Sequence, residues 1–246
     1  SLARLEAEGA EAFNCHQPHG AACELCERHD FLTSGATFDI STASGSQTIG
    51  TLSGAGAATL GSIALTFGTS QSATFSGQMT GSSSLTKAGS GTAIFSGNNS
   101  GYTGSATLQG GTWQIDGAFG GGVSVAGGTP LQGTGSIAGA VSVQASGTIK
   151  PGHSPGTLTV GSLTLNSSSN TYIQLQPARL GVEMDSSLLA VSTSASLAGT
   201  LTVDAPPGFY PSAVSYTILT AGSSRTGTFA SPVVFTSSSQ DMGPYQ

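Results

Sequence analysis

The sequence predicts an all-β chain, built as a parallel β-helix (solenoid) with a C-terminal β cap and a short non-β leader at the N-terminus. The stretch 85–116, LTKAGSGTAIFSGNNSGYTGSATLQGGTWQID, alternates apolar and polar residues in short segments, and glycines punctuate these segments. Helices need about 10 residues or more, so such segments indicate strands of about four residues joined by tight turns. Similar segments recur at intervals of roughly 20 residues, which is typical of a solenoid.

The composition limits the kinds of partner that the chain can take. Only 7% of the 246 residues are charged, against about 25% in ordinary domains, so Ser, Thr, Asn and Gln must cover the surface. The net charge of −6 argues against a nucleic-acid partner, which needs a basic patch. No apolar run approaches the ~20 residues of a membrane span, and the N-terminus lacks the apolar region of a signal peptide. If the protein is exported, we therefore expect this sequence to be a fragment or a processed piece.

The composition also divides the chain into three parts. Residues 1–32 are a partly helical leader that holds six of the twelve acids and all three cysteines, and SLARLEAEGAEAF at its start is typical of a helix. Residues 33–170 carry the repeated short strands of the β-helix. Residues 171–246 contain longer strands and are expected to form the C-terminal cap. Such a cap is needed because an open solenoid end exposes unpaired backbone N–H and C=O groups.

Three segments resemble, in the same order, parts of bacterial autotransporter passengers (type V secretion). Residues 84–111, which include Lys87, Asn99 and Tyr102, resemble the passenger-associated strand repeat. GTIKPGHSPGTLTVGSLTL at 147–165 resembles a second passenger motif, and 184–203 with 215–231 resembles the region ahead of the translocator barrel. The resemblance spans about residues 36 to 235.

The resemblance implies a right-handed parallel β-helix that is exported across the outer membrane of a Gram-negative bacterium and is then displayed on the cell surface or secreted. Its implied partner is its own translocator β-barrel, and its C-terminal part would act as an autochaperone. The function expected is that of a non-enzymatic structural stalk. One alternative is an adhesin that binds host, bacterial or glycan ligands and contributes to virulence. Another is the remnant of a passenger whose catalytic part lies upstream.

The leader contains a possible zinc site. Cys15, Cys23 and Cys26, with His29 or His19 as a fourth ligand, provide donor types and a CxxC spacing that suit tetrahedral zinc. The overall spacing matches no common zinc finger, and a disulfide that involves Cys23, Cys26 or Cys15 is an equal alternative. Passengers of the resembled family contain almost no cysteine, so the leader can also be a non-native segment. No other cofactor is expected.

Catalytic residues are hard to assemble from this sequence. His153 is the only histidine outside the leader, and beside Ser154 it lies in PGHSPG, which indicates a turn between strands. The acids between residues 31 and 240 are too scattered for a paired glycosidase site; they are Asp39, Asp116, Glu183, Asp185 and Asp204. Asp185 is expected to cap the strand that contains Leu188, or to form the turn into it. We therefore expect no enzymatic activity.

Two further surface functions depend on ladders of side chains. An ice-binding solenoid would need Thr-x-Thr ladders at a constant offset between rungs, and the sequence shows no such repeat. The large aromatic residues are expected to fill the core or to stack on successive rungs, with an exposed glycan-binding platform as the alternative; they are Phe75, Phe95, Tyr102, Trp113 and Phe119.

Overall fold

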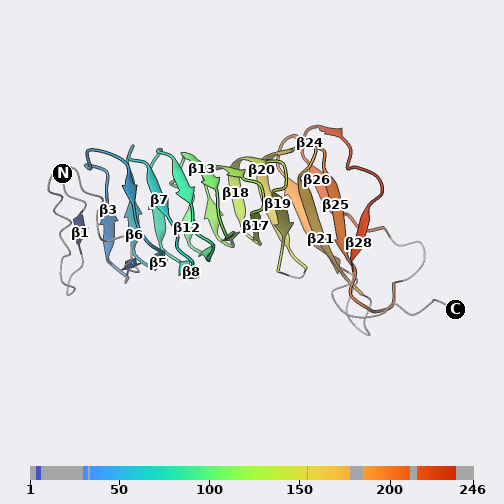
Figure 1. Ribbon diagram of the computed structural model, residues 1–246, viewed down its shortest axis with the longest axis horizontal. Coiled ribbons are helices and arrows are strands. Elements are labelled where there is room, and N and C mark those ends of the chain that lie inside the picture. Colours follow the sequence, from blue (N-terminus) through green and yellow to red (C-terminus); the bar gives the residue numbers. More distant parts are fainter. Residues whose placement is uncertain are drawn as a thin grey trace.

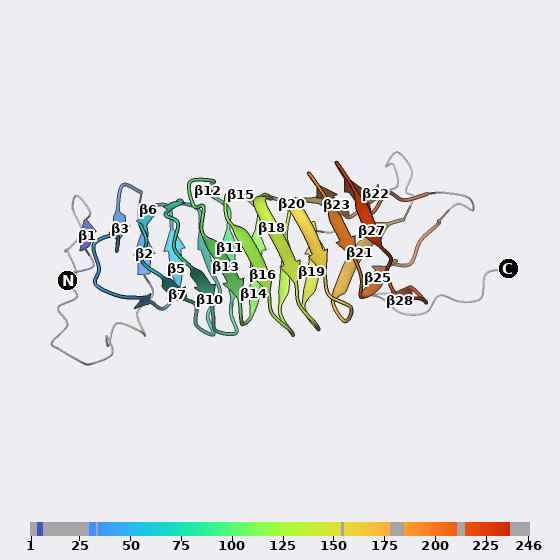
Figure 2. The same ribbon diagram turned by 90° about the horizontal axis from the view of Figure 1, so that it is seen from above.

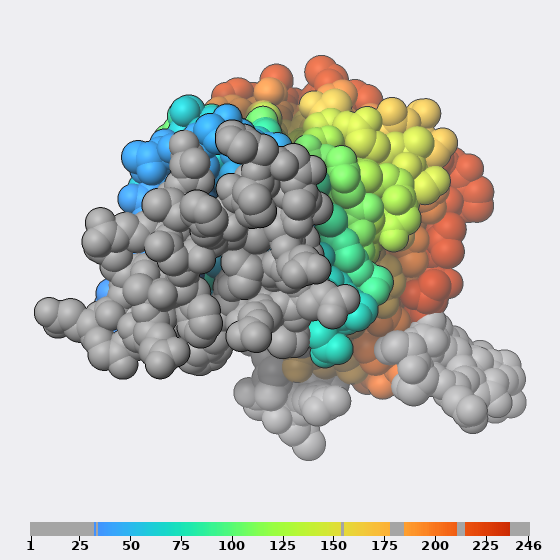
Figure 3. Space-filling view, turned by 60° about the vertical axis from the view of Figure 1, so that its left-hand side comes forward, coloured from blue at the N-terminus to red at the C-terminus, as the bar shows by residue number. Residues whose placement is uncertain are grey.

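The computed structural model shows an elongated all-β solenoid in which short strands stack along one axis (Figure 1). It describes residues 4–6, 30–32, 34–153, 155–177, 185–210 and 215–236. Figure 3 views the rod partly from its N-terminal end, and successive rungs recede from blue to red. The predicted β-solenoid is therefore confirmed, and the described residues contain no helix.

The strands are two to nine residues long. In chain order they are β1 (Arg4–Glu6), β2 (Asp30–Leu32), β3 (Thr37–Asp39), β4 (Gln47–Thr48), β5 (Leu52–Gly54), β6 (Ala57–Thr59), β7 (Leu65–Phe67), β8 (Ala73–Phe75), β9 (Gln78–Thr80), β10 (Leu85–Lys87), β11 (Thr92–Phe95), β12 (Asn98–Asn99), β13 (Ser105–Leu108), β14 (Thr112–Ile115), β15 (Ala118–Phe119), β16 (Gly122–Val125), β17 (Pro130–Gly133), β18 (Ser136–Val143), β19 (Thr148–Pro151), β20 (Thr157–Leu165), β21 (Asn170–Gln176), β22 (Asp185–Ser186), β23 (Leu188–Val191), β24 (Ala195–Leu197), β25 (Thr200–Asp204), β26 (Leu219–Ala221), β27 (Arg225–Gly227) and β28 (Val234–Thr236).

Two long sheets run the length of the rod and share its core (Figure 2). The eleven-stranded sheet follows the path β2-β5-β8-β11-β14-β17-β19-β21-β25-β28, and β22 pairs with β21 beside it. The thirteen-stranded sheet follows β4-β7-β10-β13-β16-β18-β20-β23-β26, with β12, β15, β24 and β27 off this path. A four-stranded sheet, β1-β3-β6-β9, lies at the N-terminal end. Pairing between rungs is parallel, and the two antiparallel pairs in the described residues are β1–β3 and β21–β22.

Aromatic side chains stack inside the central rungs. The ring centroids of Phe95 and Trp113 are 5.1 Å apart, and those of Trp113 and Phe119 are 5.3 Å apart. Phe75 and Tyr102 continue the stack, and all five side chains are at most 1% exposed. The prediction that these aromatics fill the core is confirmed, and the alternative of an exposed platform built from them is wrong.

Three polar residues of the strand-repeat motif also point inward, where each satisfies backbone groups. The side chain of Asn99 accepts a hydrogen bond from the Met79 amide (2.8 Å). The hydroxyl of Tyr102 donates to the carbonyl oxygen of Ser83 (2.6 Å), and Lys87 binds three carbonyl oxygens. Burying a polar group is costly unless it is hydrogen-bonded. The side chains of these three motif residues therefore link neighbouring chain turns by buried hydrogen bonds.

A column of glycines forms one corner of the solenoid. A Cβ atom on Gly97 would lie 1.9 Å from the carbonyl oxygen of Gly77, and one on Gly117 would lie 2.0 Å from that of Gly97. A Cβ atom cannot lie so close to a carbonyl oxygen, so the turn that follows each of these strands requires glycine. The punctuation by glycine that predicts the solenoid thus has a direct steric cause.

The structure aligns Ser and Thr side chains in a hydroxyl ladder, which is not the Thr-x-Thr ladder at a constant offset that an ice-binding solenoid would need. It lies on the outward face of the thirteen-stranded sheet, where the register aligns Thr48, Thr66, Thr86, Thr107, Ser124, Ser142, Thr164, Ser196 and Thr226. The sequence hides this ladder because the loops between successive rungs differ in length.

The two ends of the chain are only partly described. The structure gives Arg4–Glu6 as strand β1, paired with β3, where the sequence indicates a helix; pairing covers the otherwise open edge of the first rung. The proposed zinc ligands Cys15, Cys23, Cys26 and His29, and the alternative ligand His19, lie outside the described residues. The boundary at 170 stays a prediction, since the parallel pairing β19–β21–β25 passes through it.

Candidate functional site: a polar patch on the eleven-stranded sheet

Charged side chains are few in the central part of the rod, and those that are not buried lie on one face. Between residues 41 and 176 the chain has only three charged residues, Lys87, Asp116 and Lys150, and one histidine, His153. Lys87 is buried. The other three lie on the outer side of the eleven-stranded sheet or in the turn beside it. We call them, together with Gln114, Gln132 and Tyr172, the polar patch.

The alternation of inward and outward side chains along each strand determines where the polar patch lies. Gln114 lies between the buried residues Trp113 and Ile115 on β14, so it points outward. The parallel register aligns Gln114 with Gln132 on β17, and Gln132 with Lys150 on β19. These residues therefore form an outward column with one side chain on each rung, and neighbouring strands are separated by about 4.8 Å.

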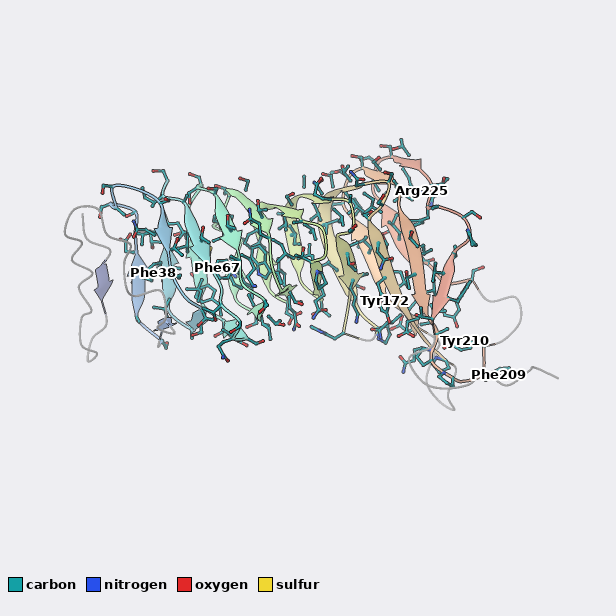
Figure 4. All side chains as sticks on the ribbon, viewed as in Figure 1. Phe38, Phe67, Tyr172, Phe209, Tyr210 and Arg225 are labelled. Carbon is teal, nitrogen blue, oxygen red and sulfur yellow. The ribbon has the colours of Figure 1, made fainter. Side chains whose placement is uncertain are left out.

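Tyr172 extends this column by one further rung. Ile149 and Thr171 are register partners, so Tyr172 on β21 follows Lys150 on β19. The Lys150 ammonium lies 4.7 Å from the centroid of the Tyr172 ring, a cation–π contact. Figure 4 labels Tyr172 on the side of the rod.

Asp116 and His153 form the only ion pair among the described residues. His153 Nε2 lies 2.6 Å from Asp116 Oδ1, although the two residues are 37 positions apart in the sequence. The turn that carries His153 begins at Gly152, whose φ of 86° favours glycine. This turn thus brings the His153 imidazole back to Asp116, which lies two rungs earlier in the stack.

Four donors surround the Asp116 carboxylate. Gln114 Nε2 donates to Oδ2 (2.7 Å), and the amide and hydroxyl of Thr134 donate to Oδ1 (3.1 and 3.4 Å). Partial burial alone would raise the pKa of Asp116, but the hydrogen bonds from Gln114, His153 and Thr134, with the charge of His153, hold that pKa below its ordinary value. Asp116 is therefore an ionised, firmly positioned acceptor at neutral pH.

Hydrogen-bonding capacity remains free elsewhere in the patch. Gln132 Nε2 donates to Gln114 Oε1 (3.0 Å), and the side-chain oxygen of Gln132 has no hydrogen bond within the described part of the chain. Lys150 has no ion-pair partner in that part either. Two of the six side chains thus present an unused acceptor and an unused cation to solvent.

The hydroxyl of Tyr172 is hydrogen-bonded to a residue of the next rung. It donates to Asp204 Oδ2 (2.7 Å), which Gln174 Nε2 also approaches (3.4 Å). Burial, followed by the hydrogen bond and the negative charge of Asp204, raises the pKa of Tyr172 to about 12. The phenol therefore stays neutral, and its ring has a fixed orientation beside Lys150.

The sequence predicts only part of this arrangement. His153 does lie in a turn, as expected, but its contact with Asp116 is not predicted. The signal available was the spacing of 18 residues between Gln114, Gln132 and Lys150, which matches one rung. Ser154 and Glu183 lie outside the described residues, so the absence of catalysis stays a prediction.

The remaining acids have local roles. Asp39 Oδ1 accepts from the Ser41 amide (2.8 Å), and Asp185 Oδ1 accepts from the Ser186 amide (2.7 Å). Asp185 is the first residue of strand β22, and its expected role as a cap of the strand at Leu188, or in the turn into it, stays a prediction. Among the described residues, no three His, Cys, Asp or Glu side chains gather closely enough to hold a metal ion.

A separate cavity of about 460 Å³ opens at the C-terminal rungs. Its lining is largely apolar and includes Leu197, Ile218, Leu219, Arg225 and Phe229. The cavity is the end of the core column, because Leu219 is the register partner of the fully buried Leu189. Its titratable lining residues are Tyr216 and Arg225, and no His, Cys, Asp or Glu lines it, so we do not take it as a candidate catalytic site.

No protein-family model matches the chain, and no curated protein is significantly similar to it. In the parts of the chain that the structure describes, no helix has the length and apolar character required to cross a membrane.

Proposed function

We propose that this chain is the stalk of an autotransporter passenger, a non-enzymatic rod that is displayed on, or released from, the outer surface of a Gram-negative bacterium. The observation that carries the proposal is the uninterrupted parallel pairing from β2 to β28. Each rung covers the apolar face of the previous one, so the stack extends as a single rod. The three sequence motifs that resemble passengers support the same function, with a translocator β-barrel as the partner.

The outer surface also suits a spacer. Hydroxyl side chains form a continuous column along the thirteen-stranded sheet, and few charges interrupt the rod. A chain with so few charges and no cysteine after residue 32 can pass through a narrow pore in extended form and fold afterwards. Folding outside the cell would make export unidirectional, because rungs that have already paired cannot pass back through the pore.

The export proposal is tested by placing residues 33–246 ahead of a translocator β-barrel in a Gram-negative host. We expect protease added to intact cells to cleave an epitope tag at residue 33, while a periplasmic marker stays intact. The matched control is Phe95→Asp, which puts a charge into the aromatic stack and should reduce the folded, surface-exposed fraction. A tag that remains protected in intact cells for both chains would contradict export.

The autochaperone role of the C-terminal part is tested at two neighbouring leucines of β23. Leu188 points outward and is half-buried, whereas Leu189 is fully buried in the core. We expect Leu189→Asp to slow refolding of the purified chain far more than Leu188→Asp. Equal refolding rates for the two variants would remove the support for nucleation at this end.

Adhesion is the second candidate function, and the polar patch is the observation that favours it. A pure spacer has no need to place the two unburied charges of residues 41–176, the one histidine of that stretch and a partly exposed tyrosine on one face. Exposed polar and aromatic groups that converge on a rigid scaffold are typical of binding sites.

A further inference from the structure

We propose that the polar patch binds an acidic, uronate-bearing polysaccharide that lies along the axis of the rod. This inference does not depend on the route of export, and it assigns a ligand class to a specific set of residues. The central contacts would be made by the column Gln114, Gln132, Lys150 and Tyr172.

The regular spacing of the column selects a linear polymer. Its side chains repeat once per rung, at about 4.8 Å. A 1,4-linked pyranose chain advances by close to this length per sugar, so successive sugars can meet successive rungs. An extended peptide advances by about 3.3 Å per residue, and side chains on one face of it repeat every second residue, so it drifts out of step with the column.

The chemistry of the column suits sugars with carboxylates. The free side-chain oxygen of Gln132 can accept a hydrogen bond from a sugar hydroxyl. The Lys150 ammonium, which has no ion-pair partner within the described residues, can bind a carboxylate. The Tyr172 ring, held by Asp204, offers an apolar surface for the C–H groups of a pyranose.

The carboxylate oxygens of the neighbouring Asp116 are already engaged within the patch. Its carboxylate already accepts hydrogen bonds from Gln114, Thr134 and His153, and the imidazole lies against it. These interactions occupy the oxygens of Asp116 and fix the position of Gln114. Asp116 and His153 are therefore positioning residues for the column, and Lys150 is its main charged contact.

The test uses the full chain and isothermal titration calorimetry with three polymers. Polygalacturonate has the proposed charge and repeat, 1,4-linked galactan has the repeat without the charge, and poly-L-glutamate has the charge with a peptide repeat. We expect saturable binding to polygalacturonate, with affinity that falls as salt rises, and at least roughly ten-fold weaker binding to the other two polymers.

Variants connect the binding to the patch. Lys150→Gln should weaken polygalacturonate binding by roughly ten-fold, and Gln132→Ala should weaken it by several-fold. The matched control is Thr107→Gln, an outward residue on the thirteen-stranded sheet, which should change nothing. Unchanged far-UV circular dichroism and melting temperature confirm that each variant is folded.

Three results would overturn the proposal. They are no detectable binding of polygalacturonate to the wild-type chain, equal binding of poly-L-glutamate and polygalacturonate, or an affinity that Lys150→Gln and Thr107→Gln leave equally unchanged. Equal binding of galactan would likewise overturn it, because Lys150 would then make no specific contact.

Discussion

Replacing Lys87 by methionine tests how the strand-repeat motif stabilises the rod. Lys87 occupies an inward position on β10 and is 1% exposed. Its ammonium donates to the carbonyl oxygens of Ala88 (2.6 Å), Gly89 (3.0 Å) and Gly110 (2.9 Å). Since Gly110 belongs to the following chain turn, Lys87 adds a side-chain link between two turns whose strands β10 and β13 are also paired.

Two opposing effects set the size of the change. Burial lowers the pKa of Lys87 from 10.5 to about 8, so keeping the side chain charged at pH 7 costs the folded state about 3 kcal/mol. Methionine removes that cost but leaves three carbonyl oxygens without their donor, at about 1–3 kcal/mol each. We therefore expect Lys87→Met to lower the free energy of unfolding by roughly 3 kcal/mol at pH 7.

The pH dependence gives a sharper assay. The folded chain releases the Lys87 proton near pH 8 and the unfolded chain near 10.5, so between these values the unfolded chain binds more protons. Wild-type stability therefore rises with pH in this window, relative to Lys87→Met, by about 2 kcal/mol between pH 7 and 9.5. Urea unfolding, followed by fluorescence of the single, buried Trp113, measures both chains.

A difference between the two chains that stays constant from pH 7 to 9.5 would refute the reasoning, as would a methionine variant more stable than the wild type at pH 7. The comparison stops at pH 9.5 because burial also raises the pKa of Tyr102, which would destabilise the fold of both chains at higher pH. Thr86→Val, on the outward side of the same strand, is the control and should show no pH-dependent difference.

Three further predictions concern the contributions of Gly97, Tyr102 and Asp116 to the stability of the rod. Gly97→Ala should lower the free energy of unfolding by at least about 2 kcal/mol, because the new Cβ atom would clash with the backbone of the neighbouring rung. The control is Gly45→Ala, which has open space around it and should change the free energy of unfolding by less than about 0.5 kcal/mol. Similar urea midpoints for the two variants would contradict the steric explanation. Tyr102→Phe should cost about 1–3 kcal/mol in the same assay, and a neutral effect would show that its hydroxyl bond contributes little. The pKa of Asp116 is lowered in the fold, so the stabilisation by its charge is present above about pH 4 and is lost as the pH falls through the folded pKa. The melting temperature of the wild type should therefore fall more steeply below pH 4 than that of Asp116→Asn, and parallel curves would contradict this.

The general architecture could be predicted from the sequence because each rung repeats a local rule. Alternation sends Phe95 and Trp113 inward, and the clash at Gly97 requires glycine at the corner. Both signals are visible within a few residues. The hydroxyl ladder was missed because it depends on register between rungs, and loops of unequal length hide it from any fixed spacing.

The polar patch is harder to predict for a related reason. His153 and Asp116 meet only because a turn reaches back over two rungs, and no rule of strand alternation gives that contact. The column of Gln114, Gln132 and Lys150 was in principle visible from its spacing, but assigning it to one face requires knowing that all three rungs share a register. Sequence patterns thus identify strands well, and they identify sites between rungs poorly.

The central claim is that the chain forms one rod of rungs in continuous register. Spin labels at Thr48 and Thr164, in a chain whose three cysteines are replaced by serine, test it by pulsed electron paramagnetic resonance. These residues are six register steps apart on the hydroxyl ladder, so their separation should be about 29 Å. Moving the second label to Thr226 adds two steps and should give about 38 Å. Two narrow distributions at these distances would support the rod, whereas broad distributions, or distances that do not increase with the number of rungs, would contradict it.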